Sequence, residues 1–227
     1  MRQVLRVEPL AIVRVGWTHR TVRLAHFVEK AGVAAHSPPK VDLDLRIVFS
    51  NNPDAYGLQR ALESGIPTES FTHRDFPSRE AFDRAVAGIL DVYEPQLIIL
   101  AGFMRILSPW FVKHYEGRIL NIHPALLPRY PGLDTHQRVL DAGDEWHGST
   151  VHFVTEELDG GPRILQGRLR VNPGEAADEL QHRVQAIEHR IYPEAAGLVG
   201  SGRIAFRDGK TFLDDREVDE PIIRTYD

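Results

Sequence analysis

The alternation of hydrophobic and polar positions predicts strands interleaved with helices along most of the chain. Short apolar runs that suit buried strands are separated by segments in which apolar residues recur every three or four positions, as on one face of a helix. The run at 96–101 is apolar almost throughout, which is typical of a central parallel strand covered on both faces. Further strands are expected at 43–49, 68–71, 118–122, 150–155 and 163–168.

Four helices are expected between these strands. A short one at 56–63 is followed by Gly65, which suits a C-cap, and Ser78 is a good N-cap for a helix whose apolar positions continue to Tyr93. Another is expected at 134–142, and a long amphipathic one has apolar positions from Ala177 to Ile191. This order predicts an α/β fold with a Rossmann-like, open, mostly parallel twisted sheet and helices on both faces.

The first 42 residues differ from the rest of the chain. They hold seven Lys or Arg and three Asp or Glu, whereas residues 43–227 hold 20 and 29. A strand is expected at 10–15, but helical periodicity is weak from there to residue 43. We therefore divide the chain into an atypical N-terminal segment (1–42), one α/β domain (43–215) and a C-terminal tail (216–227).

Composition narrows the functional classes. The 227 residues suit one large domain, and a net charge of −5 argues against nucleic acid as a partner. The absence of cysteine excludes disulfides, thiolate zinc sites and a cysteine nucleophile. No apolar run reaches the roughly 20 residues of a membrane span, and no signal-peptide pattern opens the chain. These features lead us to expect a soluble cytoplasmic protein without membrane contact.

An Asn and a His two residues apart end the strand expected at 118–122. Open α/β sheets bind ligands outside the carboxyl ends of their strands, and side chains two apart share one face. The Asn121 amide and a His123 imidazolium are both hydrogen-bond donors, so together they suit a developing oxyanion. A structural role is the alternative, in which Asn121 caps the strand exit and His123 packs under the proline-rich loop. From this pair alone the structural role is favoured.

A second polar turn, E-E-L-D-G-G-P at 156–162, follows the strand expected at 150–155. Its Asp159 can meet His123 across neighbouring strand ends, where a carboxylate would favour the protonated imidazole and relay protons. An ordinary Asp-Gly turn is the alternative. His152 faces either the same cleft or the core, and a core histidine is at least as well supported.

Three motifs resemble the glycinamide ribonucleotide formyltransferase family of purine synthesis: AGFMRILSP (101–109), NIHPALLPRYPGLDTH (121–136) and HGSTVHFVTEELDGGP (147–162). The resemblance runs from about residue 43 to residue 215. It implies transfer of a formyl group from 10-formyltetrahydrofolate to the amine of glycinamide ribonucleotide, by direct attack. It implies neither a metal ion nor a covalent enzyme intermediate. As partners it implies the ribonucleotide and the folate, with the chain a monomer or a homodimer.

The resemblance also implies roles for particular residues. Asn121 and protonated His123 would stabilise the tetrahedral oxyanion, and Asp159 would keep His123 charged and shuttle the amine proton. The folate site would comprise Asn121 and Asp159 with Arg79, Met104, Arg105, Ile106, Leu107, Thr155, Glu156, Glu157 and Leu158. The ribonucleotide would contact Gln185, Ala186, Ile187 and Glu188, with Glu188 as the favoured residue, through the substrate amine or ribose. The alternatives are a solvated surface charge for Arg79 and a solvated helix face for Glu188.

The N-terminal segment departs from the family, which opens with a strand and a glycine-rich loop that cradles the substrate phosphate. No such loop is found before Asn51, and Asp134 replaces a commoner His. One explanation is a reading-frame error between about Arg14 and Lys40. A second is real divergence, with phosphate bound by Thr18, His19, Arg20 and Arg23. A third is a folate-binding relative that has lost transfer. We expect the change to weaken ribonucleotide binding far more than folate binding.

Two other functions stay open. A formyltetrahydrofolate hydrolase would use a similar Asn, His and Asp with water as the acceptor, and a missing phosphate loop would favour it. An inactive folate-binding protein is the other. The continuation P-G-L-D-T-H (131–136) favours the transferase over the hydrolase, and the intact Asn121, His123 and Asp159 count against an inactive protein.

Overall fold

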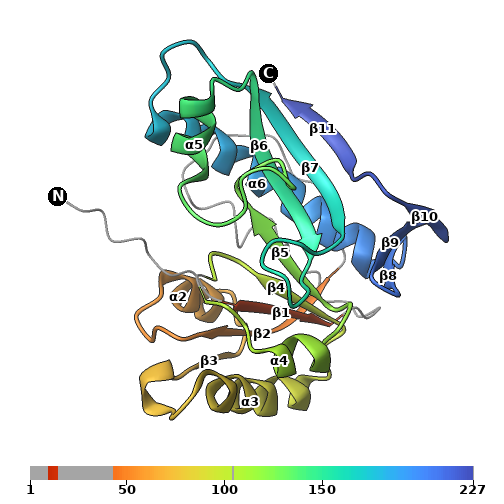
Figure 1. Cartoon of the computed structure of the whole chain (residues 1–227). Coiled ribbons are helices and arrows are strands. Elements are labelled where there is room, and N and C mark those ends of the chain that lie inside the picture. Colours follow the sequence, from red (N-terminus) through yellow and green to blue (C-terminus); the bar gives the residue numbers. More distant parts are fainter. Residues whose placement is uncertain (1–9, 15–42, 104, 227) are drawn as a thin grey trace.

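The structure of the chain is a computed structural model that describes residues 10–14, 43–103 and 105–226. Figure 1 shows one sheet running through the molecule, with helices on either side of it. The helices are α2 (Tyr56–Glu63), α3 (Arg79–Leu90), α4 (Pro109–His114), α5 (Thr135–Ala142) and α6 (Ala177–Gly200), with 3-10 turns η2 (His73–Asp75) and η3 (Asp91–Tyr93). The strands are β1 (Leu10–Arg14), β2 (Asp44–Ser50), β3 (Thr68–Ser70), β4 (Leu97–Leu100), β5 (Ile119–His123), β6 (Trp146–Phe153), β7 (Arg163–Arg170), β8 (Ile204–Arg207), β9 (Lys210–Leu213), β10 (Arg216–Val218) and β11 (Ile222–Tyr226).

The main sheet has eight strands in the order β11-β7-β6-β5-β4-β1-β2-β3. Its pairings orient β2, β3, β4, β5, β7 and β11 in one direction and β1 and β6 in the other. The prediction of an α/β fold with a mostly parallel sheet is therefore confirmed. The strand expected at 10–15 is β1, which runs antiparallel to both β2 and β4. The rest of the atypical N-terminal segment lies outside the described residues.

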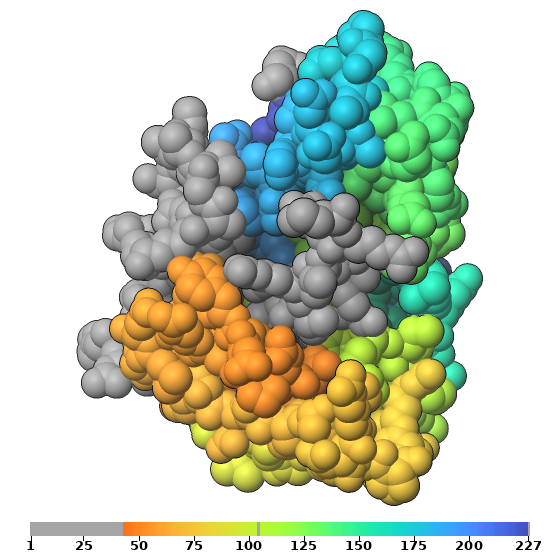
Figure 2. Space-filling view, turned by 90° about the vertical axis from the view of Figure 1, so that its left-hand side faces the viewer, coloured from red at the N-terminus to blue at the C-terminus, as the bar shows by residue number. Residues whose placement is uncertain are grey.

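Alternating residues of the central strands face two separate cores. On one face Leu97 and Ile99 of β4 join a cluster that includes residues of α2 and α6. On the other face Ile98 and Leu100 of the same strand pack with residues of α3 and α4. Because successive side chains of a strand point to opposite faces, this fully apolar strand is covered on both sides, as its sequence predicts. In the space-filling view, the segments of α2 and α3 form the lower half of the molecule, and those of α5 and α6 lie in the upper half (Figure 2).

The C-terminal stretch 216–227 was expected to be a tail, and the structure corrects this expectation. Its first strand, β10, completes a three-stranded sheet with β8 and β9. Its second strand, β11, joins the main sheet parallel to β7, with Ile222 opposite Leu165. Described residues beyond 215 are therefore folded onto the body of the molecule (Figure 1).

Most predicted elements lie within a few residues of their observed bounds. Ser78 caps α3, because its hydroxyl accepts a hydrogen bond from the Ala81 backbone N–H at 3.1 Å. Two elements extend further than expected: β6 begins four residues earlier, at Trp146, and α6 continues past Ile191 to Gly200. Within the described parts of the chain, no helix is long and apolar enough to cross a membrane. No group of three or more His, Cys, Asp or Glu side chains suits a metal ion in those parts either.

Candidate active site

Strand β5 brings Asn121 and His123 to its carboxyl end, between β4 and β6. Asn121 pairs with Leu100 of β4 on one side and with His152 of β6 on the other. His123 pairs with Thr150 and is only 5% exposed. The apolar residues Ile119 and Leu120 bury the start of the strand in the two cores, which fixes the register that places the polar pair.

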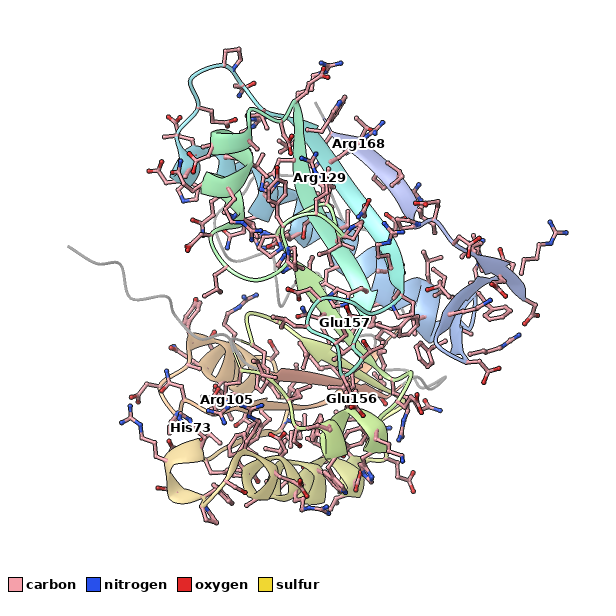
Figure 3. All side chains as sticks on the ribbon, in the orientation of Figure 1. His73, Arg105, Arg129, Glu156, Glu157 and Arg168 are labelled. Atoms are coloured by element: carbon pink, nitrogen blue, oxygen red, sulfur yellow. The ribbon has the colours of Figure 1, made fainter. Side chains whose placement is uncertain are left out.

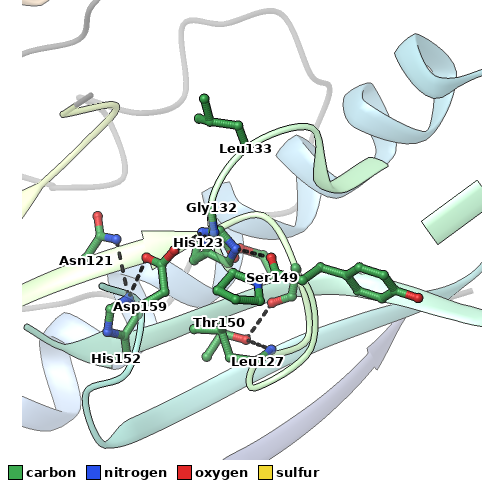
Figure 4. A network of polar contacts seen from close by, with 12 residues as sticks. Asn121, His123, Leu127, Gly132, Leu133, Ser149, Thr150, His152 and Asp159 are labelled. Carbon is green, nitrogen blue, oxygen red and sulfur yellow. Dashed lines mark hydrogen bonds and ion pairs between the residues drawn. The ribbon is translucent and has the colours of Figure 1, made fainter. Parts of the chain in front are cut away.

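His123 lies between an acceptor on each side of its ring. Its Nε2 is 2.8 Å from the backbone oxygen of Tyr130, and its Nδ1 is 3.4 Å from Oδ2 of Asp159. A carbonyl oxygen only accepts hydrogen bonds, so Nε2 carries a proton and donates it to Tyr130. The second acceptor, a carboxylate that is 8% exposed, suits a proton on Nδ1 as well. The Nδ1 side of the His123 ring faces the Asp159 carboxylate (Figure 4).

Asn121 is oriented by His152. Nδ1 of His152 is 2.8 Å from the backbone oxygen of Phe153 and must donate to it. Burial lowers the pKa of His152, so the ring is neutral and its Nε2 is an acceptor. Nδ2 of Asn121 lies 3.3 Å from this Nε2 and donates one N–H to it. The second N–H of the same amide remains to meet a substrate oxygen.

Asp159 is held in place by its backbone and by a loop that it anchors. It adopts a left-handed conformation with φ of 53°, which the Asp-Gly turn accommodates. Its Oδ2 also accepts the Gly132 backbone N–H at 2.9 Å. The carboxylate thus links the turn after β6 to the proline-rich loop after β5 and is more than an ordinary turn residue.

Buried polar residues of β6 and β7 fix that proline-rich loop. Thr150 donates to the Ala125 oxygen at 2.6 Å and accepts the Leu127 N–H at 3.1 Å. Gln166 of β7 donates to the Leu127 oxygen at 2.7 Å. These bonds satisfy backbone groups that would otherwise be buried without partners. They hold the loop where His123 reaches the Tyr130 oxygen.

Helix α6 reaches the same strand ends with two polar side chains. Glu188 Oε1 is 2.9 Å from the hydroxyl of Ser149, which is itself 2.7 Å from the backbone oxygen of His123. One turn along, the Tyr192 hydroxyl is 2.7 Å from the Leu100 oxygen and 2.9 Å from the Leu120 oxygen. Burial raises the pKa of Glu188 to about 7 and that of Tyr192 well above its ordinary value.

Two further histidines, His136 and His147, contact each other near His123. Nδ1 of His136, on α5, is 2.9 Å from Nε2 of His147, on β6. Burial lowers the pKa of His136 to about 4 and that of His147 to about 3, and the nearby His123 acts in the same direction on both. Both rings are therefore neutral near pH 7.

The residues expected at the folate site come from the start of α3, the loop after β4, the end of β5 and the turn after β6. The Arg105 guanidinium lies over the Phe82 ring, 5.0 Å from the ring centroid. Burial lowers the pKa of His73, and the charge of the nearby Arg105 lowers it further. Glu156 and Glu157 are exposed in the turn after β6 (Figure 3). Arg79 begins α3, Thr155 and Leu107 are partly buried, and the side chains of Ile106 and Leu158 are 58% and 60% exposed. Met104 lies outside the described residues, as do Thr18, His19, Arg20 and Arg23.

The segment expected to bind the ribonucleotide lies on α6. Ile187 is buried at 3% exposure in the core against β7, so its side chain is a packing residue. Gln185 is exposed, while Ala186 and Glu188 are partly buried. Within residues 185–188, Glu188 is the residue whose side chain is linked to His123, through the Ser149 hydroxyl.

Comparisons with known proteins identify the family of this chain. A family model described as "Formyl transferase" matches residues 25–196. The chain belongs to the formyl transferase family. It is 50% identical over 179 residues to phosphoribosylglycinamide formyltransferase of Escherichia coli strain K12, which covers 79% of this chain and 84% of that protein.

Two further relatives support the assignment of this formyl transferase. The human trifunctional purine biosynthetic protein adenosine-3 is 41% identical over 166 residues, 73% of this chain and 16% of that protein. A solved structure of phosphoribosylglycinamide formyltransferase from Coxiella burnetii superposes with a TM-score of 0.77 at 46% identity. That superposition covers 81% of this chain and 87% of the other.

Sequence reasoning missed several residues that surround Asn121, His123 and the loop after β5. Ser149, Thr150 and His147 belong to β6, in which every residue from 147 to 153 is buried. Three of the four residues at 147–150 are polar, and a polar run inside a fully buried strand is itself a signal of function, because such groups need partners. Gln166 and Tyr192 gave no comparable signal.

Proposed function

We propose that this formyl transferase moves the formyl group of 10-formyltetrahydrofolate to the amine of glycinamide ribonucleotide, a step of purine biosynthesis. The observation that carries the proposal is the cluster of Asn121, His123 and Asp159 at the ends of β5 and β6. It offers two donors and one carboxylate around a common space (Figure 4). The kinship with phosphoribosylglycinamide formyltransferases supplies the substrate pair.

The reaction proceeds by direct attack. The neutral amine of the ribonucleotide adds to the formyl carbon, and the carbonyl oxygen becomes an oxyanion. The free N–H of Asn121 and the Nδ1–H of His123 stabilise that charge, as donors pre-organised in a water-poor site do. The C–N bond to the folate then breaks, and the amine proton passes to the leaving nitrogen. The products are formylated ribonucleotide and tetrahydrofolate.

Asp159 has two roles in this proposal. As a buried carboxylate 3.4 Å from Nδ1 it favours the charged form of His123. It also accepts the proton that the attacking amine loses, directly or through water, and returns it to the folate nitrogen. The neutral His152 orients Asn121 for the same step.

The two substrates are proposed to lie on different sides of this cluster. The folate is assigned to Arg79, Asn121 and Asp159 together with residues 104–107 and 155–158. The ribonucleotide is assigned to the α6 side, with Gln185, Ala186 and Glu188 as its contacts. The buried Ile187 supports the helix from within the core instead of touching substrate.

The test is to identify the products. The purified chain is incubated with 10-formyltetrahydrofolate and glycinamide ribonucleotide, and the nucleotide is analysed by mass spectrometry. We expect one formyl group on the ribonucleotide amine for each tetrahydrofolate released. Free formate with unmodified ribonucleotide would instead identify a hydrolase. If neither product forms but the folate still binds, the chain is a folate-binding protein without transfer.

A further inference from the structure

Ser149 occupies a buried position between the catalytic strand and α6. Its side chain is 0% exposed. Its Oγ lies 2.7 Å from the backbone oxygen of His123 and 2.9 Å from Oε1 of Glu188. The proposed mechanism uses neither contact, although together they join the proposed ribonucleotide side of the site to the proposed oxyanion donor.

Counting hydrogens decides how these three oxygens are bonded. The Ser149 hydroxyl has one hydrogen, and the carbonyl of His123 can only accept it. If Ser149 donates to His123, the contact with Glu188 needs a hydrogen from Glu188 itself. If Glu188 is ionised, one of the two short oxygen contacts has no hydrogen between its atoms and is repulsive. The full set of contacts therefore requires a protonated Glu188.

The groups around Glu188 agree with a neutral carboxyl. Burial raises its pKa to about 7. Tyr192, one turn along α6, is a neutral phenol. From the elements packed against α6, Ser149 of β6 contacts Glu188, and His123 of β5 is reached through Ser149. His136 of α5 and His147 of β6 lie near His123, and both are neutral near pH 7.

We propose that Glu188 is a hydrogen-bond donor in the ligand-free formyl transferase and that, through Ser149, it positions His123. Ionisation of Glu188 turns the Ser149 hydroxyl toward the carboxylate and removes one of two hydrogen bonds to the His123 carbonyl, leaving the one from the Ala125 N–H at 2.8 Å. The inference rests on the proposed function only where it calls His123 catalytic. Ser149 and Glu188 are positioning residues in this chain of contacts, whatever else Glu188 contacts in the substrate complex.

Kinetics of three variants test the positioning role. We expect Ser149→Ala to lower kcat about tenfold with little change in KM, because a misplacement of a catalytic group by about 1 Å can lower the rate about 100-fold and a smaller shift lowers it less. Ser149→Thr keeps the hydroxyl and should recover most of the lost rate. Ser64→Ala is the matched control, since the exposed Ser64 hydroxyl also donates to a backbone oxygen, that of Arg60 at 2.8 Å, and its loss should leave kcat unchanged. The positioning role is overturned if Ser149→Ala keeps the parental kcat. It is also overturned if Ser149→Thr is as slow as Ser149→Ala.

A titration that needs no turnover tests the protonation of Glu188. The ligand-free chain is labelled with carboxyl ¹³C glutamate, and the Glu188 signal is assigned by its absence from Glu188→Gln. We expect this signal to titrate near pH 7, apart from the bulk of the glutamates. Titration with the exposed glutamates, near their ordinary pKa of about 4.3, overturns the proposal. Because this readout is independent of catalysis, it stands even if the chain proves inactive, and so separates this inference from the proposed function.

Discussion

At the scale of single residues, the proposed chemistry depends on three side chains and on the groups that fix them. His123 is held by Tyr130 and Asp159, and Asn121 by His152. The Asn121 amide keeps one hydrogen bond to the protein and has a second N–H for the substrate. Both sides of the His123 ring face protein acceptors, so in this proposal its Nδ1 is shared between Asp159 and the substrate oxygen. Pre-organisation of this kind, more than the identity of the residues alone, makes donors effective toward an oxyanion.

Asp159→Asn is expected to lower kcat by about 10²- to 10⁴-fold, the range of general acid–base contributions. The amide oxygen of the new side chain can still accept the Gly132 N–H, so the loop after β5 should stay in place. Only the negative charge and its ability to carry a proton are lost. Steady-state rates of tetrahydrofolate release measure the effect.

The control for that variant is Asp208→Asn. Asp208 is an exposed turn residue between β8 and β9. Like Asp159, it has a positive φ, of 49°, and is followed by a glycine. It should keep the parental rate. If Asp159→Asn also keeps that rate, Asp159 takes no part in proton transfer.

The sequence predicted that Asn121, His123 and Asp159 lie close together, but it did not predict the contacts that support them. Asn121, His123 and Asp159 stand at strand ends, where motif and position agree. Their supporting contacts join residues far apart in the chain: Ser149 is 26 positions from His123 and 39 from Glu188. Such pairs depend on strand order and register, which local periodicity does not specify.

At the scale of elements, strand ends and tight turns set the site. The turn after β6 carries Asp159 and closes against the strand, because the Phe153 N–H donates to the Pro162 oxygen at 2.9 Å. A Cβ on Gly161 would lie 1.8 Å from the backbone oxygen of Phe153. Gly161 is therefore required for close backbone approach and not only for turning.

Gly161→Ala should displace this turn, lower the free energy of unfolding by about 1–3 kcal/mol as overpacking does, and reduce kcat through Asp159. Urea unfolding and steady-state rates measure the two effects. Gly88→Ala is the control, since a Cβ there meets open space on α3 and should be neutral or stabilise by up to about 1 kcal/mol. Equal behaviour of the two variants would contradict the close-approach argument.

Sequence periodicity predicted the long and well-buried elements and missed the marginal ones. The apolar run of β4 and the apolar stripe of α6 were predicted because their side chains are buried: β4 contributes to both cores, and α6 to one of them. Strands β8 to β11 have three to five residues each, and β11 is largely exposed along its length. Such short strands form through pairing with neighbours more than through their own pattern.

At the scale of the whole molecule, buried neutral histidines link stability to pH. Burial holds the pKa of His147 at about 3, below the ordinary value of 6.5 that the unfolded chain has. Between these values the unfolded state binds more protons than the folded state, so the free energy of unfolding decreases as pH falls. This destabilising contribution of His147 to the free energy of unfolding is absent above about pH 6.5 and grows as the pH falls toward 3.

His147→Gln removes this titration. Between pH 7 and pH 4, the free energy of unfolding of the variant should fall by roughly 3 kcal/mol less than that of the parent, because the variant lacks a histidine whose pKa is lowered by folding. This difference does not depend on how stable the variant is at pH 7. Urea unfolding at several pH values measures the difference. His182→Gln, on the exposed face of α6, is the control and should follow the parent. Parallel stability curves for parent and His147→Gln would show that His147 does not titrate on unfolding.

The whole-molecule architecture was predicted because alternating strands and helices allow few topologies. The sheet order and the antiparallel strands β1 and β6 were not predicted, since they depend on contacts between distant segments. The expected difference between ribonucleotide and folate binding concerns the N-terminal segment, which lies largely outside the described residues. It stays a prediction that calorimetry with each ligand can test.

Tetrahydrofolate release from 10-formyltetrahydrofolate by the purified chain, with and without glycinamide ribonucleotide, tests the central claim most directly. The proposed function predicts rapid release that requires the ribonucleotide, because its amine is the nucleophile that completes the site. Release at the same rate without the ribonucleotide would contradict the claim and identify water as the acceptor. No release in either case, with the folate still bound, would also contradict it and would indicate a folate-binding protein without transfer activity.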